Sequence, residues 1–293
     1  MSGFRFARPQ NIEEAHQLFN EAPGQTVYLA GGTDLLVKYR KGEITPELVI
    51  SLTGLPGLDQ VSQAGDMIVI GGLARLEDIR LAPLVASRLP VLADALNNMA
   101  SVQIRNAATM AGNIMNAAPS ADTAPPLLVL DARLVLEGPE GERRGMIEDF
   151  FLGPGQAAAR PGEILTAFEI PVPPFPSGGA YAKVSRRKAM DLALLGVAVQ
   201  IEFEADIETC RQARIALGVA GPTPLRARQA EASLKGRVID QESLDRAGRL
   251  AVGESFCRDS LRGQAWYRQE MIRVYVRRMG LKAQERARAG EGR

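Results

Sequence analysis

Two glycine-containing turns hold the residues whose types and spacing indicate a binding chemistry. The first, Gly31-Gly32-Thr33-Asp34, follows a β-branched and aromatic run at residues 26–30 that is typical of a strand. Glycines between a strand and a helix let backbone amides approach an anion, and the helix dipole favours negative charge there. The turn is neither a Walker loop nor a Gly-x-Gly-x-x-Gly fingerprint. It predicts either a phosphate contact or an ordinary strand-to-helix turn, with Asp34 capping the helix.

The second turn, Thr109-Met110-Ala111-Gly112-Asn113, lies within residues 100–126, a stretch with eight Ala and only two charged side chains, Arg105 and Asp122. We interpret this stretch as irregular backbone, and one that long in a compact domain is usually functional. Its Thr, Asn and Asp side chains can bond to sugar or ribityl hydroxyls. A polyhydroxylated, phosphorylated ligand fits this inventory. The alternative is a small-residue packing loop in which Asp122 caps a helix over residues 123–131.

The scarcity of Cys and His limits which reactions the side chains can perform. The chain has two Cys, Cys210 and Cys257, and one His, His16. No zinc or iron–sulfur spacing can be built from them, so we predict no metal ligands. We expect His16 at a solvated helical position and predict no catalytic residue, while both Cys are expected as small apolar, buried or half-buried residues. An enzyme of this composition would take its chemistry from an organic cofactor.

Length and charge restrict the class of protein further. The 293 residues hold 35 Lys+Arg and 34 Asp+Glu, a net charge of +1, which argues against nucleic-acid binding. No apolar run approaches the roughly 20 residues that span a bilayer. The N-terminus lacks the apolar stretch of a secretory signal. We therefore expect a cytoplasmic protein without membrane insertion.

The elements that must position the two turns follow from hydrophobic periodicity. A strand at 26–30, a helix at 35–41 and a strand at 48–52 predict a small parallel βαβ unit after a first helix that starts at Asn11. Further strands are expected at residues 67–70, 133–136, 163–170, 195–204 and 213–219. Further helices are expected at residues 76–80, 91–99, 227–235, 241–252 and 260–288. The Pro- and Gly-rich residues 171–179 indicate a domain boundary, followed by an α+β region with strands first and helices last.

Several motifs, taken in order, resemble the FAD-binding subunit of the molybdenum hydroxylases, the family of carbon monoxide dehydrogenase and the split-subunit xanthine dehydrogenases. They span nearly the whole chain. The matching motifs are Ala30-Gly-Gly-Thr-Asp-Leu35, Gln103-Ile-Arg-Asn106, Thr109-Met-Ala-Gly-Asn113, Pro119-Ser-Ala-Asp-Thr-Ala-Pro125, Gly162-Glu-Ile-Leu165, Tyr181-x-Lys183 and Trp266-Tyr-Arg268.

The resemblance implies an α+β fold. It consists of an FAD-binding domain of the vanillyl-alcohol-oxidase type at residues 1–176, with lobes at about 1–54 and 55–176, and a C-terminal domain at residues 177–293 with an antiparallel sheet and helices.

The resemblance also implies an FAD site. The first pyrophosphate loop corresponds to Tyr28, Leu29, Ala30, Gly31, Gly32, Thr33, Asp34 and Leu35, and the second to Thr109, Met110, Ala111, Gly112 and Asn113. Asp122 matches the acidic residue near the ribityl chain, Leu165 a backbone contact to the flavin edge, and Met99 an apolar position near the adenine or the ring. Ala111 stands where the usual pattern has Gly, which is tolerable if its φ is negative.

Lys183 matches the lysine beside the isoalloxazine ring. Six of the 35 basic residues are Lys, and Lys183 follows the Pro/Gly linker in a strand-like context. A cation beside the pyrimidine end of a flavin would stabilise its reduced form. Without the resemblance, a lone Lys is more often a solvated surface residue.

The function implied is that of an electron-transferring flavoprotein subunit. A large molybdopterin-molybdenum subunit and a small subunit with [2Fe-2S] clusters would be its partners, assembled as a dimer of heterotrimers. FAD in this chain would pass electrons to NAD, oxygen or a quinone. The alternatives are a stand-alone FAD-dependent oxidase or reductase, which needs a proton acceptor, and a binding module that has lost the cofactor. A branch with an extra iron–sulfur cluster in this subunit is disfavoured, because two Cys cannot ligate one.

Overall fold

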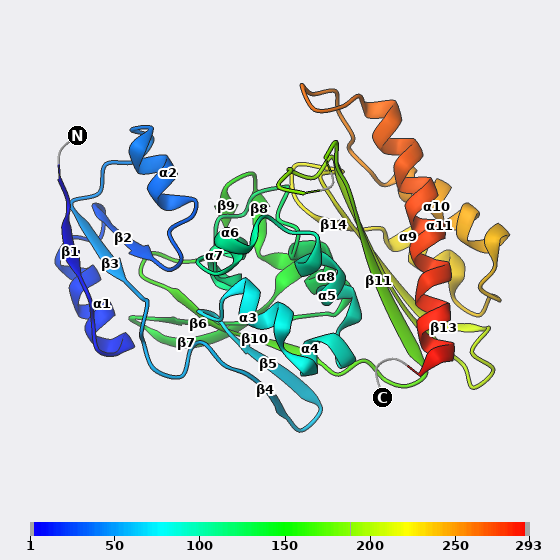
Figure 1. Cartoon of the computed structure of the whole chain (residues 1–293), viewed down its shortest axis with the longest axis horizontal. Helices are drawn as coiled ribbons and strands as arrows, with labels where there is room; N and C mark the ends of the chain where they lie inside the picture. Colours follow the sequence, from blue (N-terminus) through cyan, green and yellow to red (C-terminus); the bar gives the residue numbers. More distant parts are fainter. Residues whose placement is uncertain (1–2, 188, 291–293) are drawn as a thin grey trace.

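The computed structural model describes residues 3–187 and 189–290. Figure 1 shows three groups of elements in a row along the long axis: a small N-terminal lobe, a central sheet with short helices, and a C-terminal sheet with longer helices. This arrangement of sheets and helices fits the predicted α+β class. Within the described residues, no helix is both long and apolar enough to cross a membrane.

The N-terminal lobe contains the predicted parallel unit. Its elements are β1 (Arg5–Ala7), α1 (Ile12–Glu21), β2 (Thr26–Leu29), α2 (Leu35–Arg40) and β3 (Leu48–Ser51). The three strands are parallel in the order β1–β3–β2, and β1 is an addition to the prediction. Helix α1 begins after Asn11, whose side chain accepts a hydrogen bond from the Glu14 amide (2.8 Å). Because β2 ends at Leu29, the first glycine turn lies at the carboxyl end of a parallel strand.

The central region is an antiparallel sheet with helices packed on it. Its strands, in sheet order, are β4 (Val61–Ala64), β5 (Met67–Gly71), β10 (Ile164–Pro171), β6 (Arg133–Gly138) and β7 (Gly141–Met146). The helices are α3 (Leu76–Leu81), α4 (Pro83–Arg88), α5 (Pro90–Asn97), α6 (Val102–Arg105), α7 (Met110–Met115) and α8 (Ala124–Val129). A short helix η1 (Ile147–Asp149) and a small hairpin, β8 (Phe151–Gly153) and β9 (Gln156–Ala157), complete the region. A single apolar core joins the sheet to these helices.

The prediction that residues 100–126 are irregular is wrong in part. The stretch contains α6, α7 and the first turn of α8. Ser101 accepts a hydrogen bond from the Ile104 amide (3.3 Å), and Thr109 accepts one from the Gly112 amide (3.1 Å). These side-chain caps start helices of only four and six residues, which are too short to show apolar periodicity in the sequence.

The C-terminal region is a second antiparallel sheet covered by helices. Its strands, in sheet order, are β11 (Ser177–Val184), β12 (Leu195–Phe203), β13 (Cys210–Gly218) and β14 (Leu225–Arg226), and its helices are α9 (Arg228–Leu234), α10 (Gln241–Gly253) and α11 (Ala265–Ala289). The predicted helix start at residue 260 is wrong. Residues 255–264 form a loop, and within it the Asp259 carboxylate accepts a hydrogen bond from the Ala265 amide (2.6 Å) at the first residue of the helix.

Two glycines of the predicted linker belong to strand β11. A Cβ atom on Gly178 would lie 1.9 Å from the carbonyl oxygen of Ala283 in α11, and one on Gly179 would lie 2.0 Å from Gln200 Oε1. Gly178 therefore permits close packing of α11 on the sheet, and Gly179 leaves room for the Gln200 side chain of β12. The chain passes from the central to the C-terminal sheet between Pro171 and Ser177.

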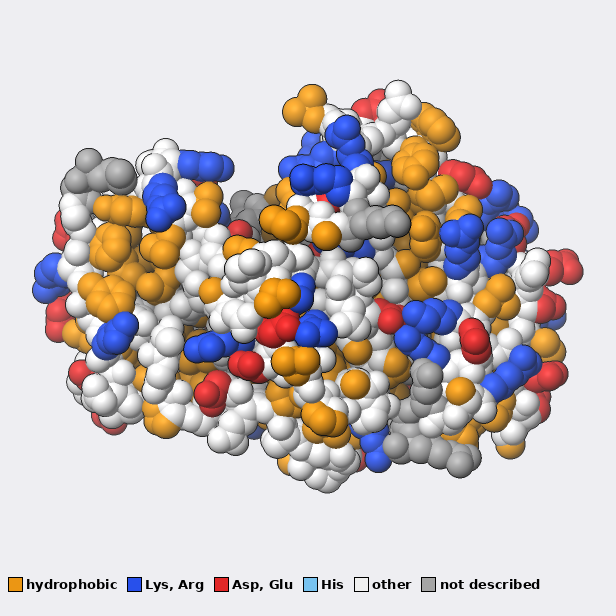
Figure 2. Space-filling model, in the orientation of Figure 1, with side chains coloured by type: hydrophobic (Ala, Val, Ile, Leu, Met, Phe, Trp, Pro, Cys, Tyr) orange, Lys and Arg blue, Asp and Glu red, His pale blue; other side chains and the backbone are white. Residues whose placement is uncertain are grey.

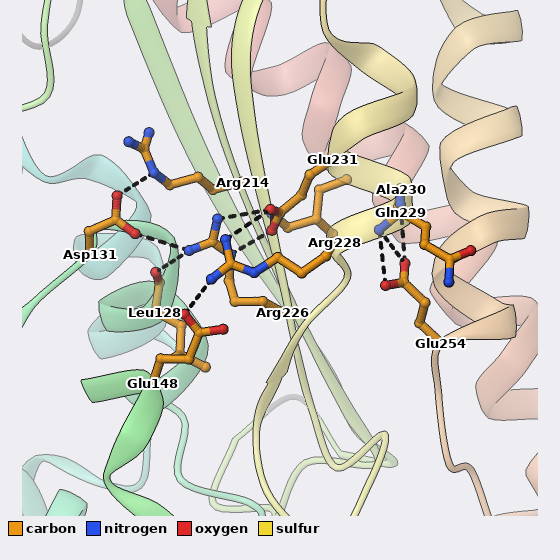
Figure 3. Close-up of polar contacts among 11 residues, drawn as sticks. Leu128, Asp131, Glu148, Arg214, Arg226, Arg228, Gln229, Ala230, Glu231 and Glu254 are labelled. Carbon is orange, nitrogen blue, oxygen red and sulfur yellow. Dashed lines mark hydrogen bonds and ion pairs between the residues drawn. The ribbon is translucent and has the colours of Figure 1, made fainter. Parts of the chain in front are cut away.

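A cluster of charges joins α8 to the C-terminal sheet, and we call Asp131, Arg214, Arg226 and Glu231 the arginine junction (Figure 3). Asp131 accepts a hydrogen bond from Arg226 (3.0 Å) and forms an ion pair with Arg214 (2.5 Å). Arg226 also donates to both Glu231 carboxylate oxygens (2.5 and 2.9 Å) and to the carbonyl oxygen of Leu128 (3.1 Å). Its side chain is only 3% exposed, so this guanidinium is buried with all its partners in place.

Candidate functional site

Two adjoining cavities lie where the N-terminal lobe meets the central helices. The first cavity, about 330 Å³, is lined by the residues that follow β2, by residues between 104 and 116, and by the start of β10. The second, about 340 Å³, is lined by Asp122 and Lys183, and both cavities share Thr33, Met99 and Asn113. Figure 2 shows the surface notched at its upper edge between the N-terminal lobe and the rest of the molecule. The two segments of the chain that bear the glycine turns therefore meet at one site.

Most of the predicted site residues line the first cavity. They are Tyr28, Ala30, Gly31, Gly32, Thr33, Asp34, Leu35, Met99, Thr109, Ala111, Gly112, Asn113 and Leu165. Asp122 and Lys183 line the second cavity. Leu29 and Met110 line neither cavity, since Leu29 ends strand β2 and Met110 is fully buried in the central core.

The first glycine turn has the backbone of an anion-binding loop. A Cβ atom on Gly31 would lie 2.1 Å from the carbonyl oxygen of Ala107, so only Gly lets this turn approach the second one. Gly32 has a φ of +69°, which favours Gly. Within the described residues, the backbone amides of residues 31–35 donate to no protein acceptor. Adjacent amides without partners at a cavity wall are donors for an anion.

Asp34 precedes α2 at the capping position, but its side chain makes no capping hydrogen bond. The prediction that it caps the helix is therefore wrong for the side chain. Its backbone is already helical, with φ −102° and ψ −47°, whereas a capping residue has extended backbone that aims its side chain at the next amides. The exposed Asp34 carboxylate lines both cavities.

The amides of Met110 and Ala111 in the second glycine turn already donate to acceptors elsewhere in the protein. The amides of Met110 and Ala111 donate to the carbonyl oxygens of Ala74 (3.2 Å) and Gly72 (3.1 Å). The Asn113 side-chain oxygen accepts from the Thr123 hydroxyl (2.7 Å). Ala111 lies within α7, where φ is negative, so the methyl group that replaces a usual Gly causes no backbone strain. This turn therefore offers the side chains of Thr109 and Asn113, and contact surface, in place of free amides.

Asp122, Tyr181 and Lys183 form a buried polar group in the wall of the second cavity. Lys183 Nζ donates to Asp122 Oδ2 (2.7 Å), and Tyr181 Oη donates to Asp122 Oδ1 (3.1 Å). The alternative that Asp122 caps the next helix is wrong, because α8 starts at Ala124 and the carboxylate turns toward β11. Each carboxylate oxygen keeps one lone pair for a further donor.

Burial and charge have opposite effects on the pKa of Asp122 and the same effect on the pKa of Tyr181. Burial raises the pKa of Asp122, while the Lys183 ammonium and the two hydrogen bonds lower it. Burial, together with the Asp122 charge, raises the pKa of Tyr181 well above its ordinary value. Tyr181 is thus a site residue outside the predicted set. The sequence feature that could have indicated Tyr181 is its spacing of two from Lys183, because residues i and i+2 of a strand face the same side.

Among the described residues, no His or Cys side chain lines either cavity. The expectation that His16 is solvated is wrong, because it is 9% exposed and packs inward with Ala15 and Phe19 on one face of α1. Cys210 is buried, and burial raises the pKa of its thiol to about 12; Cys257 is half-buried. No group of three His, Cys, Asp or Glu side chains in the described part of the chain could hold a metal ion.

Comparison with known proteins identifies the family. The family described as FAD binding domain in molybdopterin dehydrogenase matches residues 2–173. The chain belongs to this family. A second family, the CO dehydrogenase flavoprotein C-terminal domain, matches residues 180–283. The resemblance seen in the sequence motifs is thus confirmed, and FAD is the cofactor of the family.

The relatives cover nearly the whole chain. The carbon monoxide dehydrogenase medium chain of Afipia carboxidovorans is 33% identical over 97% of this chain and 98% of its own length. The xanthine dehydrogenase FAD-binding subunit of Escherichia coli O157:H7 is 32% identical over 92% of this chain and 91% of its own. A crystal structure of the Cu,Mo-CO dehydrogenase superposes with a TM-score of 0.92 at 33% identity, covering 98% of this chain and 99% of that one.

The residues of this chain fit FAD. The free amides of residues 31–35 suit a pyrophosphate, and the Gly31 approach to Ala107 shapes the turn that would hold it. Thr109, Asn113 and Asp122 suit hydroxyl groups, and Lys183 supplies a cation at the second cavity.

Proposed function

We propose that this chain is the FAD-binding electron-transfer subunit of a multi-subunit molybdenum hydroxylase. FAD, when bound, accepts electrons one at a time from iron–sulfur clusters of a partner and delivers them to an external acceptor. The observation that supports this most is the row of partnerless amides at residues 31–35, which face a cavity with no His or Cys among its described lining residues. The work of the chain is then to hold, orient and electrostatically tune the cofactor.

The residues proposed to hold FAD are those predicted from the sequence, with two qualifications from the geometry. Residues 28–35 and 109–113 would contact the pyrophosphate, but the amide donors come from the first loop alone. Leu29 and Met110 would act through packing, because neither lines a cavity. Asp122 would position Lys183 near the flavin ring, and Leu165 and Met99 would contact the ring or the adenine.

The domain division proposed is residues 1–176, with lobes at about 1–54 and 55–176, and residues 177–293. The three sheets support it, since each sheet, with the segments packed on it, contributes most of one apolar cluster. The central cluster also includes Tyr181, Ala198 and Ala216 of the C-terminal sheet. The family matches at 2–173 and 180–283 also support it.

The proposed partners are a large molybdopterin-molybdenum subunit and a small subunit with [2Fe-2S] clusters, assembled as a dimer of heterotrimers. Two relatives are named medium chains of carbon monoxide dehydrogenases, which supports a place between a larger and a smaller chain. NAD, oxygen or a quinone as acceptor, and the cytoplasmic location, stay predictions.

Purification of the tagged chain from its native host tests this function. We expect two further subunits, with molybdenum in the larger, iron in the smaller and one FAD in this chain, and FAD that is reduced only when the complex receives substrate. A chain that purifies alone with FAD and oxidises an organic substrate unaided would contradict the proposal. It would support the stand-alone oxidase or reductase instead.

A further inference from the structure

Lys38 extends from α2 to the opposite side of the first cavity. Its ammonium donates a hydrogen bond to the Asn116 side-chain oxygen (2.8 Å), and both residues line the cavity. Lys38 lies on the small N-terminal lobe and Asn116 at the end of α7. Its Nζ atom is therefore held between the two segments that carry the glycine turns.

Lys38 is the one basic side chain among the described residues that line the first cavity. Two acidic side chains line the same cavity, Asp34 and Glu163. Glu163 is neutralised by Arg143, which donates to both of its carboxylate oxygens (2.6 and 2.7 Å). Asp34 is exposed and makes no capping hydrogen bond, so its charge remains in the cavity mouth.

This charge inventory is unfavourable for a diphosphate unless a cation contributes. A diphosphate diester carries two negative charges, and Asp34 adds a third at the same opening. Backbone amides supply hydrogen bonds but no net charge. Lys183 belongs to the second cavity and is already paired with Asp122 (2.7 Å). Lys38 has only a neutral amide oxygen as partner, so its full charge is available.

We propose that Lys38 is a cofactor-binding residue that pairs with the diphosphate of FAD, with Asn116 holding its ammonium over the cavity. The inference rests on the proposed function, because it takes FAD as the occupant. It adds a positively charged contact, which neither glycine loop supplies. It also gives α2 a role in closing the N-terminal lobe over the cofactor.

The test compares full-length variants freed of flavin and titrated with FAD at low and high salt. Lys38→Met removes the charge and keeps the length of the side chain, while Lys38→Arg keeps the charge. Lys41→Met is the matched control, since Lys41 follows α2, is 65% exposed and faces Glu43 at 3.7 Å. We expect Lys38→Met to weaken FAD binding by about 10- to 100-fold, the usual range for a lost bond to a charged group.

Salt dependence separates a contact to phosphate from a general loss of structure. We expect FAD affinity of the wild type, Lys38→Arg and Lys41→Met to fall as salt rises, because salt screens the attraction between residue 38 and the diphosphate. The FAD affinity of Lys38→Met should fall less, because this variant lacks that attraction. Equal affinity of Lys38→Met and wild type would overturn the inference and leave the proposed function intact. A weakened Lys38→Met with unchanged salt dependence would overturn it too. A wild type that binds no FAD would instead contradict the proposed function.

Discussion

The arginine junction and the first cavity are both polar regions between parts of the chain, but their polar groups are satisfied in opposite ways. In the junction, Arg226 is 3% exposed and bonds to two carboxylates and a carbonyl oxygen. In the cavity, the amides of residues 31–35 have no protein partner and Lys38 has only Asn116. Polar groups that complete one another stabilise the fold, whereas groups left incomplete mark the place for a ligand.

Asp122 and Lys183 combine both properties. Their side chains are 7% and 6% exposed, so their ion pair is about as buried as the Arg226–Glu231 pair of the junction, yet it lines a cavity. The group can therefore serve the fold and the cofactor together. Variants whose unfolding free energy and FAD affinity are both measured test whether each region serves the fold, the cofactor or both.

The largest expected effect on the cavity comes from Gly31→Val. A Cβ at this position would lie 2.1 Å from the Ala107 carbonyl oxygen, and backbone cannot rotate away as a side chain can. We expect FAD affinity to fall by about 100-fold or more, which corresponds to about 3 kcal/mol. Calorimetric titration with FAD measures it. Gly24→Val is the control, because a Cβ there meets nothing within 4 Å; equal affinities of the two variants would refute this role of Gly31.

In the arginine junction, Arg226→Met should lower stability and leave FAD affinity unchanged. Removing one member of a buried charge network typically costs about 3–5 kcal/mol, because Glu231 loses its main partner and Asp131 keeps only Arg214. We expect the denaturant midpoint to fall while the folded variant keeps wild-type FAD affinity. Arg249→Met, which removes an exposed pair with Asp245 on α10, should change stability by under about 1 kcal/mol. A loss of FAD affinity in Arg226→Met as large as that in Gly31→Val would contradict the claim that the junction serves the fold and the cavity serves the ligand.

Glu77→Gln should have an intermediate, pH-dependent effect. Hydrogen bonds from Arg80 and then Arg105 lower the pKa of Glu77 from 4.5 to about 2, and Arg105 also donates to the Met99 carbonyl oxygen at the cavity wall (2.6 Å). Because the pKa of Glu77 is lower in the folded than in the unfolded protein, its ionised carboxylate stabilises the fold. This contribution to the free energy of unfolding is full above about pH 5 and is lost as the pH falls toward 2.

We expect Glu77→Gln to cost about 2–3 kcal/mol at pH 7 and progressively less below pH 4.5, measured by urea unfolding across pH. Glu142→Gln is the control, because its pair with Arg144 is exposed. A cost for Glu77→Gln that is constant between pH 7 and pH 3 would show that the charge is not what stabilises this segment.

Tyr181→Phe should have the smallest effect. It removes one donor from the buried Asp122 carboxylate but leaves Lys183 in place, so we expect a loss of about 1 kcal/mol in unfolding free energy. The same change raises the pKa of Asp122 further and weakens the fixed position of Lys183. The reduction potential of the bound FAD should therefore shift, whereas Tyr275→Phe on α11 should leave it unchanged. No shift in the Tyr181→Phe potential would assign Tyr181 to stability alone.

The sequence predicts the elements whose pattern is local. The parallel βαβ lobe, the glycine turns and strand β12 follow from β-branched runs, glycines and alternation. Strand β7 has the sequence Gly-Glu-Arg-Arg-Gly-Met with alternate residues exposed, and no apolar run marks it. Strand β11 starts with Ser-Gly-Gly, which is typical of a loop unless a helix packs closely on it.

The residues of the candidate site likewise divide into those that a local sequence pattern predicts and those that depend on tertiary contacts. Gly31, Gly32 and Asp122 are predictable because glycine turns and acidic residues in apolar stretches are unusual in sequence. Lys38 is not, since nothing in the sequence of α2 distinguishes it from Lys41 before the fold brings it beside Asn116. Tertiary contacts between segments 78 residues apart decide that role, and they cannot be read from spacing.

A crystal structure of the FAD-loaded chain tests the central claim most directly, namely that the cofactor lies between the two glycine turns. The account predicts the diphosphate within hydrogen-bond distance of the amides of residues 31–35, with the isoalloxazine ring toward Lys183 and the second cavity. A diphosphate bound away from residues 31–35, or a flavin in any other cavity of the chain, would contradict it.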